Sequence, residues 1–533
     1  MRSKGMILVA LLLAAFLVNL DTTLVNVALP ALVRDLHATT TQLQWVVDAY
    51  NLVFAALLLT FGSLSDRFGR KGMLLAGLVV VGGASLAGGF MTSAGQLIAA
   101  RAVMGLGAAM TFPATLSLIS NVFTERKERA RAIGLWGAIA GVAIALGPIV
   151  GGYLLAHFSW GSIFIAMAPV AAFAVALAAL VVPASRNPDP TPLDFPGLVL
   201  SSAMMALLVY TIIEAPAYGW GSARTVAGFA VAAALLAVFV LAERRSAHPM
   251  LDVRLFRNMR FSAASGAVTV AFFTLFGFIF LITQYFQFVR GYSPLSAGVR
   301  LLPVALSVAV GSIAGTQLAV RAGTKLVVTA GLVAMAAFYG WVAASMTSSL
   351  GYGVIAVQMV VYGLGLGLTS APATEAIMGA VSRKMAGVGS AVNDTTRLVG
   401  GTLGVAVLGS VYASVYGSRL TATIPAGVPQ PVAALARQSV GAAYVASGQL
   451  AAGHPALGQA LHLASTNAFL RGTITGSLVA GGVAAAGAIL AAIFLPAQPA
   501  TQEAAPTPAA NPAANPAANP ARGTGPAYPD PVM

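Results

Sequence analysis

Long apolar segments with almost no charge recur along the whole chain, and they constrain its fold more than any other feature. Of the 533 residues, 58% are hydrophobic and only 8% are charged. Soluble proteins carry about 25% charged residues, because their surfaces face water. A helix of about 20 apolar residues spans a bilayer, and each of these segments reaches that length. The sequence therefore predicts an all-α integral membrane protein.

The apolar segments predict fourteen transmembrane helices, because an isolated strand cannot satisfy its backbone hydrogen bonds in lipid. The first segment follows Arg2 and Lys4, as in a signal peptide, but it continues past Asp21 and so predicts an uncleaved helix. The predicted spans are residues 6–30, 43–63, 73–92, 95–119, 132–155, 160–183, 196–215, 223–242, 261–287, 297–320, 325–345, 353–376, 386–412 and 472–496.

The loops between these spans carry the orientation signal. Most of the 29 Lys and Arg residues fall in loops on one side, with clusters at 67–71, 126–131, 244–260 and 383–384. Since basic loops stay in the cytoplasm, both termini are predicted to be cytoplasmic. The net charge of +14 then reflects orientation, and we expect no nucleic-acid partner.

Several kinds of site are excluded or disfavoured by residue usage. The chain has no cysteine, which excludes disulfides and thiolate metal centres, and its five histidines are scattered. There is no nucleotide-binding loop and no Ser/His/Asp grouping, which disfavours a membrane-embedded enzyme. We therefore expect no metal, no nucleotide and no cofactor.

An internal repeat indicates two related halves. The segment 66–71, followed by Ala76-Gly77, recurs 254 residues later as 320–325, followed by Ala330-Gly331, with Arg, Gly, Lys, Ala and Gly in register. Secondary transporters commonly consist of two such repeats. The predicted regions are an N-terminal six-helix half (1–183), two inserted helices with a cytoplasmic linker (184–260), a C-terminal six-helix half (261–496) with an external segment (413–471), and a disordered cytoplasmic tail (497–533).

Charged residues inside spans are the candidates for chemistry. Arg101 lies at membrane depth, where a charge costs at least about 2.5–3.5 kcal/mol unless it is paired or hydrated. Asp394 and Arg397 are three residues apart on a helix and are expected to neutralise each other. The acids within or near spans are Asp21, Asp48, Glu214, Glu375 and Asp394. An acid that faces each side of the membrane in turn can carry a proton down its gradient.

Two further patterns bear on movement and binding. Gly147, Pro148, Gly151 and Gly152 open one helix face to close packing and weaken a backbone hydrogen bond, which suits either a helix that moves or a static kink. The ninth span is rich in aromatic residues, which line substrate pockets but more often face lipid or core. The residues that we place in a possible pocket are Asp48, Phe273, Phe276, Phe280 and Glu375.

Four stretches resemble motifs of one transporter family. Residues 62–71 read G-x-L-x-D-R-x-G-R-K, similar to the loop between the second and third spans of the major facilitator superfamily. Residues 20–30 resemble the first-span signature of its fourteen-span drug:proton antiporters. Residues 97–109 resemble the fourth-span motif with an embedded arginine, although Met104 stands where Gln is usual. Residues 143–152 resemble the fifth-span antiporter motif, and the likeness extends over about residues 6–412 and 472–496.

The resemblance implies a fold of two six-helix halves plus two inserted helices. It implies proton coupling by Asp21 and Arg101, to which we add Asp48 as a second acid. It also implies a hairpin that regulates conformational change, with Gly62, Asp66, Arg67, Gly69, Arg70 and Lys71.

The function that follows is proton-coupled efflux of hydrophobic or cationic small molecules across a bacterial plasma membrane by alternating access. The partners would be the substrate and the bilayer, and the proton gradient would be the energy source. A proton symporter, or an exporter of an ordinary metabolite, remains the alternative.

Overall fold

A computed structural model describes residues 4–186, 193–381 and 386–496. Within these ranges the chain is helical and contains no strand. The tail predicted to be disordered, 497–533, lies outside the described residues. Fourteen helical segments are long and apolar enough to cross a membrane, which confirms the predicted number of spans.

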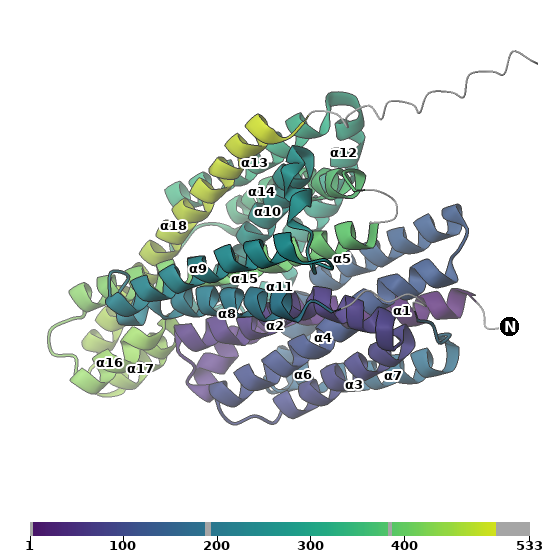
Figure 1. The fold of residues 1–533 in the computed structure, drawn as a ribbon. Helices are drawn as coiled ribbons and strands as arrows, with labels where there is room; N and C mark the ends of the chain where they lie inside the picture. Colours follow the sequence, from purple (N-terminus) through teal and green to yellow (C-terminus); the bar gives the residue numbers. More distant parts are fainter. Residues whose placement is uncertain (1–3, 187–192, 382–385, 497–533) are drawn as a thin grey trace, which may run out of the picture. The chain divides into compact units, whose positions relative to one another are not determined.

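The helices are numbered along the chain (Figure 1). Two span-forming segments consist of an α-helix joined to a shorter piece, namely α6 with α7 and α11 with α12. A π-helix, η2, extends α10. The bounds are α1 Lys4–Leu36, α2 Thr40–Phe68, α3 Arg70–Gly88, α4 Ala94–Val122, α5 Arg126–His157, α6 Ser162–Ile165, α7 Met167–Val181, α8 Phe195–Tyr218, α9 Ala223–Arg245, η1 Val253–Arg257, α10 Met259–Gln284, η2 Tyr285–Val289, α11 Pro294–Val299, α12 Leu302–Ala322, α13 Thr324–Ser345, α14 Tyr352–Gly379, α15 Ala386–Thr423, α16 Gln430–Gln438, α17 Val440–Gly453 and α18 Pro455–Phe494.

Local sequence sets where several of these helices begin. Thr39 and Gln42 form a capping box at the start of α2, in which each side chain accepts from the other residue's backbone N–H. Ser93, Asp194 and Ser222 cap α4, α8 and α9 by accepting a backbone N–H with the side chain. The polar residues between apolar runs therefore divide the chain into separate helices.

The predicted external segment 413–471 is more helical than the span boundaries indicate. Helix α15 continues to Thr423, α18 already begins at Pro455, and α16 and α17 lie between them. This segment is rich in alanine, a strong helix former, so the two spanning helices extend beyond the predicted spans.

Helix packing repeats between two parts of the chain, which we call the N-terminal set (α1–α7) and the C-terminal set (α10–α18). In the N-terminal set α1 packs on α5, α2 and α3 pack on α4, and α3 packs on α7. In the C-terminal set α10 packs on α15, α12 and α13 pack on α14, and α13 packs on α18. The helix order is the same in both sets, as expected for an internal repeat.

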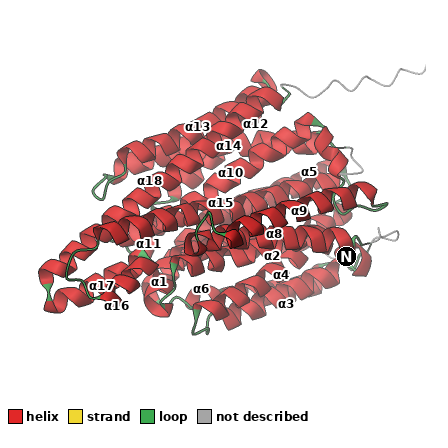
Figure 2. Cartoon of the chain, turned by 60° about the vertical axis from the view of Figure 1, so that its left-hand side comes forward, coloured by secondary structure: helices red, strands yellow, loops and turns green. Residues whose placement is uncertain are grey.

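The inserted helices lie along one seam between the two sets (Figure 2). Helix α8 packs against both α2 and α15, and α9 packs on α8. A small apolar cluster holds this seam together, with Leu52 from α2, Val209 and Ile213 from α8, and Ala406 from α15. The insertion therefore covers the junction between α2 and α15.

The two sets are hydrogen-bonded to each other at one end of the bundle. We call it the α17 end, and we call the opposite end, with Lys4 and the 62–71 hairpin, the hairpin end. Among the described residues, the hydrogen bonds between the sets join Gln287 to the Val27 carbonyl (2.9 Å), Thr40 to the Gln438 carbonyl (3.0 Å), and Gln44 to the carbonyls of Val405 and Ala406 and to Ser410. The structure is thus closed at the α17 end.

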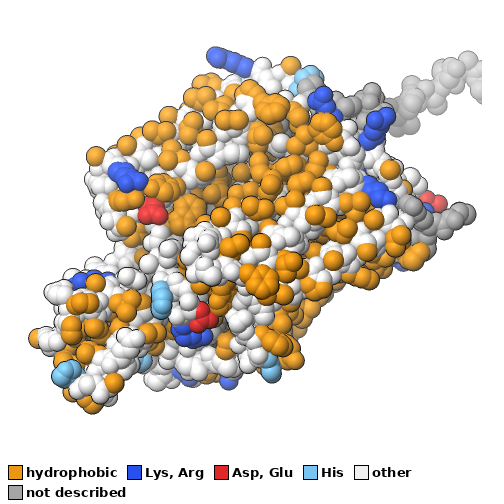
Figure 3. All heavy atoms as spheres, turned by 90° about the horizontal axis from the view of Figure 1, so that it is seen from below, with side chains coloured by type: hydrophobic (Ala, Val, Ile, Leu, Met, Phe, Trp, Pro, Cys, Tyr) orange, Lys and Arg blue, Asp and Glu red, His pale blue; other side chains and the backbone are white. Residues whose placement is uncertain are grey.

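The outer surface of the bundle matches a lipid environment. Large apolar side chains such as Leu180, Val310 and Ile489 are at least 59% exposed. The face in Figure 3 is covered mostly by hydrophobic side chains, with few charged ones. Such a surface would be unstable in water, which agrees with fourteen membrane-crossing helices.

The tight turn in the 62–71 hairpin gives a first prediction. Gly69 joins α2 to α3 with φ = +115°, a conformation that residues with a Cβ rarely adopt, and Gly323 joins α12 to α13 with φ = +86°. Gly69→Ala should lower the stability by about 1–3 kcal/mol. Gly72→Ala is the matched control, because Gly72 is helical and has open space beside it. Thermal unfolding in detergent measures both. Equal stability of the two variants would show that the turn is not strained.

Candidate functional site

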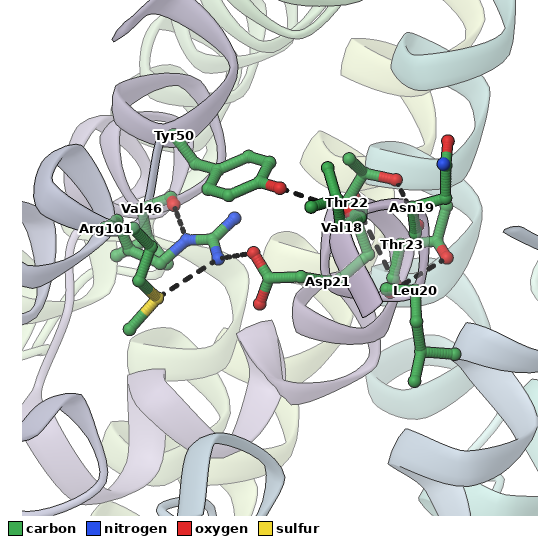
Figure 4. A network of polar contacts seen from close by, with 11 residues as sticks. Val18, Asn19, Leu20, Asp21, Thr22, Thr23, Val46, Tyr50 and Arg101 are labelled. Atoms are coloured by element: carbon green, nitrogen blue, oxygen red, sulfur yellow. Dashed lines mark hydrogen bonds and ion pairs between the residues drawn. The ribbon is translucent and has the colours of Figure 1, made fainter. Parts of the chain in front are cut away.

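Three helices meet at a buried ion pair. Asp21 of α1 and Arg101 of α4 are both fully buried, and Arg101 Nη1 donates to Asp21 Oδ2. Figure 4 shows the carboxylate pointing at the guanidinium, with the Tyr50 ring of α2 beside it. The structure thus brings together the two residues that the sequence analysis placed first in proton coupling.

Arg101 has further partners on α2. Its Nε donates to the Val46 carbonyl at 3.0 Å, and its guanidinium carbon lies 4.4 Å from the centre of the Tyr50 ring. The Tyr50 hydroxyl in turn donates to the Val18 carbonyl of α1 at 3.0 Å. A cation over an aromatic face is stabilised when both are desolvated. Arg101 therefore links α1, α2 and α4.

The pair is not fully satisfied. Asp21 Oδ1 and Arg101 Nη2 are buried and have no hydrogen-bond partner among the described residues. In a low-dielectric interior each charge of an ion pair is stabilised by the other, and an unpaired buried charge is costly. Removal of either charge would therefore leave a buried charge without its partner.

Small residues make this junction possible. A Cβ on Gly105 would collide with the Tyr50 carbonyl of α2, and one on Gly107 would collide with Gly77 and Val81 of α3. The glycines of the fourth-span motif thus allow α4 to approach both helices closely. Met104, which stands where the family has Gln, places its sulfur 3.7 Å from Arg101 Nη1.

Asp48 lies outside this network. It is fully buried on α2, but both of its carboxylate oxygens lack a partner among the described residues. It is four residues from Gln44, which bonds to α15, and three residues from Asn51, whose amide atoms also lack partners. These three residues share the helix face opposite to the one that carries Val46 and Tyr50.

The fifth-span motif lies where α5 meets two other helices. Cβ atoms on Gly147 and Gly151 would press on Thr23 and Leu24 of α1, and one on Gly152 would press on Pro294 and Leu295 of α11. Gly298 of α11 packs in turn against the Pro148 carbonyl. The motif therefore joins α1 of the N-terminal set to α11 of the C-terminal set, within the closure of the α17 end.

The hairpin 62–71 makes polar contacts with α7 and with the segment that follows it. Arg70 Nε donates to Asp66 Oδ1 at 2.7 Å, and its backbone N–H donates to the Ser185 carbonyl. Lys71 Nζ donates to the Ala179 carbonyl of α7 at 2.7 Å. The Arg67 guanidinium lies beside the Phe68 ring, and Gly62 lies against Pro113 of α4. The hairpin thus ties α2, α3 and the end of α7 together.

A cavity of about 490 Å³ lies between the two sets. It has an aromatic wall and a few polar groups from both sets. Its lining includes Asn19, Thr22, Phe54, Phe112, Trp136, Gly137, Gly141, Pro148, Phe272, Phe276, Phe278, Ser312, Ser370, Thr374, Asp394 and Arg397. Its apolar surface with a small number of polar groups is typical of small-molecule pockets.

The pocket predicted from sequence differs from this cavity in most of its residues. Phe276 lines it, but Phe273, Phe280, Asp48 and Glu375 do not. Phe273 packs against Gly404 of α15, Phe280 and Asp48 are buried in the helix packing, and Glu375 is exposed on α14. Helix α10 is apolar on every side, so its sequence alone does not show which face borders the cavity.

Asp394 and Arg397 line the cavity and do not form an ion pair within the described residues. Arg397 Nη2 donates to Thr374 Oγ1 at 3.1 Å, and its guanidinium lies 5.1 Å from the Phe272 ring centre. Asp394 accepts a long hydrogen bond from the Asn393 amide, at 3.4 Å. The expected direct pairing of these two side chains is therefore not found among the described residues. Glu214 accepts from the Trp45 indole at 3.4 Å, between α8 and α2.

Several residues of the site were not predicted from the sequence. Tyr50, Asn19 and Thr22 contact the ion pair or the cavity, and Trp136 and Phe112 form part of its wall. Asn19 and Thr22 are three residues apart in α1, as residues on one helix face are, which is a signal that could have been used. Trp136 and Phe112 carried no comparable signal.

Comparison with known proteins agrees with this geometry. The model of the Major Facilitator Superfamily matches residues 11–405. The chain is 37% identical to the multidrug efflux pump LfrA of Mycolicibacterium smegmatis, over 83% of this chain and 87% of that protein. It is 34% identical to the methyl viologen resistance protein SmvA of Salmonella typhimurium, over 87% and 92% of the two chains. It is also 36% identical to the methylenomycin A resistance protein of Streptomyces coelicolor, over 76% and 86%.

Solved structures share the fold. A bacterial homolog of the human lysosomal transporter Spinster gives a TM-score of 0.63 at 18% identity, covering 92% of this chain and 97% of that one. The D-xylose–proton symporter gives 0.58 at 13% identity, covering 92% and 98%. Together with the fourteen apolar helices, these relatives identify a multi-pass protein of the plasma membrane. The chain belongs to the Major Facilitator Superfamily, and within it to the fourteen-span drug:proton antiporters.

Proposed function

We propose that this protein exports hydrophobic or cationic small molecules in exchange for protons. Relatives at 34–37% identity are named as multidrug efflux or antibiotic and methyl viologen resistance proteins, which supports export of such compounds. The aromatic wall of the cavity suits flat apolar compounds and organic cations, since aromatic faces attract cations.

One observation carries the proposal. Asn19 and Thr22 line the cavity, and Asp21, which lies between them in the sequence, holds Arg101 on another side of the same helical turn. Binding of substrate at the cavity and protonation at the ion pair therefore act on one turn of α1. This arrangement allows the two events to be coupled without direct contact between substrate and proton.

The proposed cycle is alternating access of the two sets. The N-terminus is taken to face the cytoplasm, in agreement with the basic loops, so the closed α17 end is the external end. In this inward-facing form Asp21 releases its proton to the cytoplasm, and the cavity receives substrate from the cytoplasm or the inner leaflet. The two sets, which correspond to the proposed halves 1–183 and 261–496, then rotate relative to each other. The hydrogen bonds donated by Gln287 and Thr40 break, and the substrate is released on the external side. Protonation of Asp21 accompanies the return.

The role of Asp21 is tested by Asp21→Asn. This variant should abolish proton-driven uptake of a cationic dye into everted membrane vesicles, because it cannot exchange a proton at the ion pair. Asp35→Asn is the control, because Asp35 is exposed near the end of the same helix and should transport normally. Normal uptake by Asp21→Asn, or wild-type uptake that a protonophore leaves unchanged, would contradict proton coupling through this residue.

The energetics of the pair are tested by removing its members one at a time. Arg101→Ala leaves the Asp21 carboxylate buried and unpaired, and should lower stability by about 3–5 kcal/mol. The double variant Asp21→Asn/Arg101→Ala should recover part of that loss, because no buried charge remains. Thermal unfolding in detergent compares them. A double variant less stable than Arg101→Ala would mean that the two side chains are not energetically paired.

The cavity is tested by filling it. Gly141→Phe places a ring in the cavity from α5, where a side chain meets open space, and should weaken the binding of an aromatic dye severalfold without unfolding the protein. Gly340→Phe on α13 is the control, because Gly340 is exposed, also has open space beside it and does not line the cavity. Fluorescence titration of the purified protein measures both. Equal dye affinities of Gly141→Phe and Gly340→Phe would show that the substrate binds outside this cavity.

A further inference from the structure

A proline in α5 leaves one backbone carbonyl without its usual donor. In an α-helix the carbonyl of Ile144 accepts the N–H of residue 148, but that residue is Pro148 and has no N–H. The Thr23 hydroxyl of α1 donates to this carbonyl at 3.1 Å. A side chain from another helix thus supplies the hydrogen bond that the proline removes.

This arrangement is specific to one proline of the structure. Five described helices contain a proline beyond the first turn, at positions 30, 113, 148, 216 and 372. The carbonyls four residues earlier belong to Asn26, Ala109, Ile144, Ile212 and Leu368. Among the hydrogen bonds of the described residues, Ile144 is the one of these that accepts from a side chain of another helix.

Two carbonyls lie within reach of the Thr23 hydroxyl, so the preferred acceptor must be identified. It has one proton to donate, and the Leu20 carbonyl of its own helix lies 3.4 Å away. The Leu20 carbonyl already accepts within α1, whereas the Ile144 carbonyl lacks its helical donor, so the bond to α5 gains more. Gly147 lies directly beneath Thr23, and a Cβ there would displace the hydroxyl.

The position of Thr23 connects two parts of the proposed mechanism. Asp21, Thr22 and Thr23 are consecutive in α1 and project to different sides (Figure 4). Asp21 meets Arg101 of α4, Thr22 lines the cavity, and Thr23 bonds to α5. On the next turn of α5, Gly152 contacts α11 of the other set, within the closure of the α17 end.

We propose that Thr23 is a positioning residue that fixes the proline bend of α5 to α1, so that a change at the Asp21–Arg101 pair is passed to the closure between α5 and α11. The inference rests on the proposed function for the meaning of that change. The bond itself and its effect on the closure can be measured without transport.

The test is a double-mutant cycle read out by distance. The chain has no cysteine, so spin labels at Tyr153→Cys on α5 and Val299→Cys on α11, both exposed positions, report the separation at the α17 end. Thr23→Val keeps the shape of the side chain and removes the hydroxyl. It should raise the population of widely separated labels about fivefold, which corresponds to the loss of one buried hydrogen bond. Thr23→Ser should behave as the wild type.

Thr23→Val in two proline variants tests whether the Ile144 carbonyl, which Pro148 leaves without its helical donor, causes the effect of this substitution. Pro148→Ala restores the N–H at 148 and hence the bond within α5, so Thr23→Val should have no further effect in that background. Pro113→Ala is the matched control, because that proline lies in α4, and there Thr23→Val should keep its full effect. An equal effect of Thr23→Val in all three backgrounds, or no effect in any, would overturn the proposal.

Two further outcomes are informative. If Thr23→Val alone fails to fold, Pro148→Ala/Thr23→Val should fold as well as Pro148→Ala, and failure of that rescue also overturns the proposal. If the wild type exports nothing, the proposed function is wrong, but the distance cycle still tests whether Thr23 holds the bend.

In everted vesicles, Thr23→Val should lower dye uptake and Thr23→Ser should restore it.

Discussion

The buried pair of Asp21 and Arg101 is the interaction on which the account of this protein depends. Both side chains are fully enclosed by α1, α2 and α4, where charges are not screened by water. Neither charge can be lost without leaving the other uncompensated. The pair and its hydrogen bonds join three helices, and in the proposed function protonation of Asp21 weakens this junction of the N-terminal set.

Close packing connects the helices of the ion pair to the helices around them. Glycines at 105, 147 and 152 bring α4, α5 and α11 into backbone contact with their neighbours, so a small shift in one helix cannot be absorbed by flexible side chains. The fifth-span motif contacts α1 on one side and α11 on the other, and the Thr23 hydroxyl bonds to the carbonyl that Pro148 leaves free. The cavity lies beside this junction, since Pro148 itself forms part of its lining.

Much of the fold could be predicted from sequence because membrane helices are set by local composition. The fourteen spans followed from apolar length, and the hairpin turn at Gly69 and its repeat at Gly323 followed from short motifs. Arg101 was expected to be paired or hydrated, because a charge at membrane depth is costly, but its partner Asp21 is known from the structure alone. Of the residues predicted for a pocket, Phe276 lines the cavity, whereas Phe273 and Phe280 lie elsewhere on the same helix. That helix is apolar all round, and tertiary packing alone selects the face that borders the cavity. Tyr50 and Thr23 were missed for the same reason.

In the proposed function, binding of substrate and binding of a proton are linked through Asp21. The most direct measurement is proton release when a cationic dye is added to the purified protein in weakly buffered detergent solution, followed with a pH indicator. We expect the wild type to release protons when it binds dye, and Asp21→Asn to bind dye without releasing them. Proton release from Asp21→Asn equal to that of the wild type would contradict it.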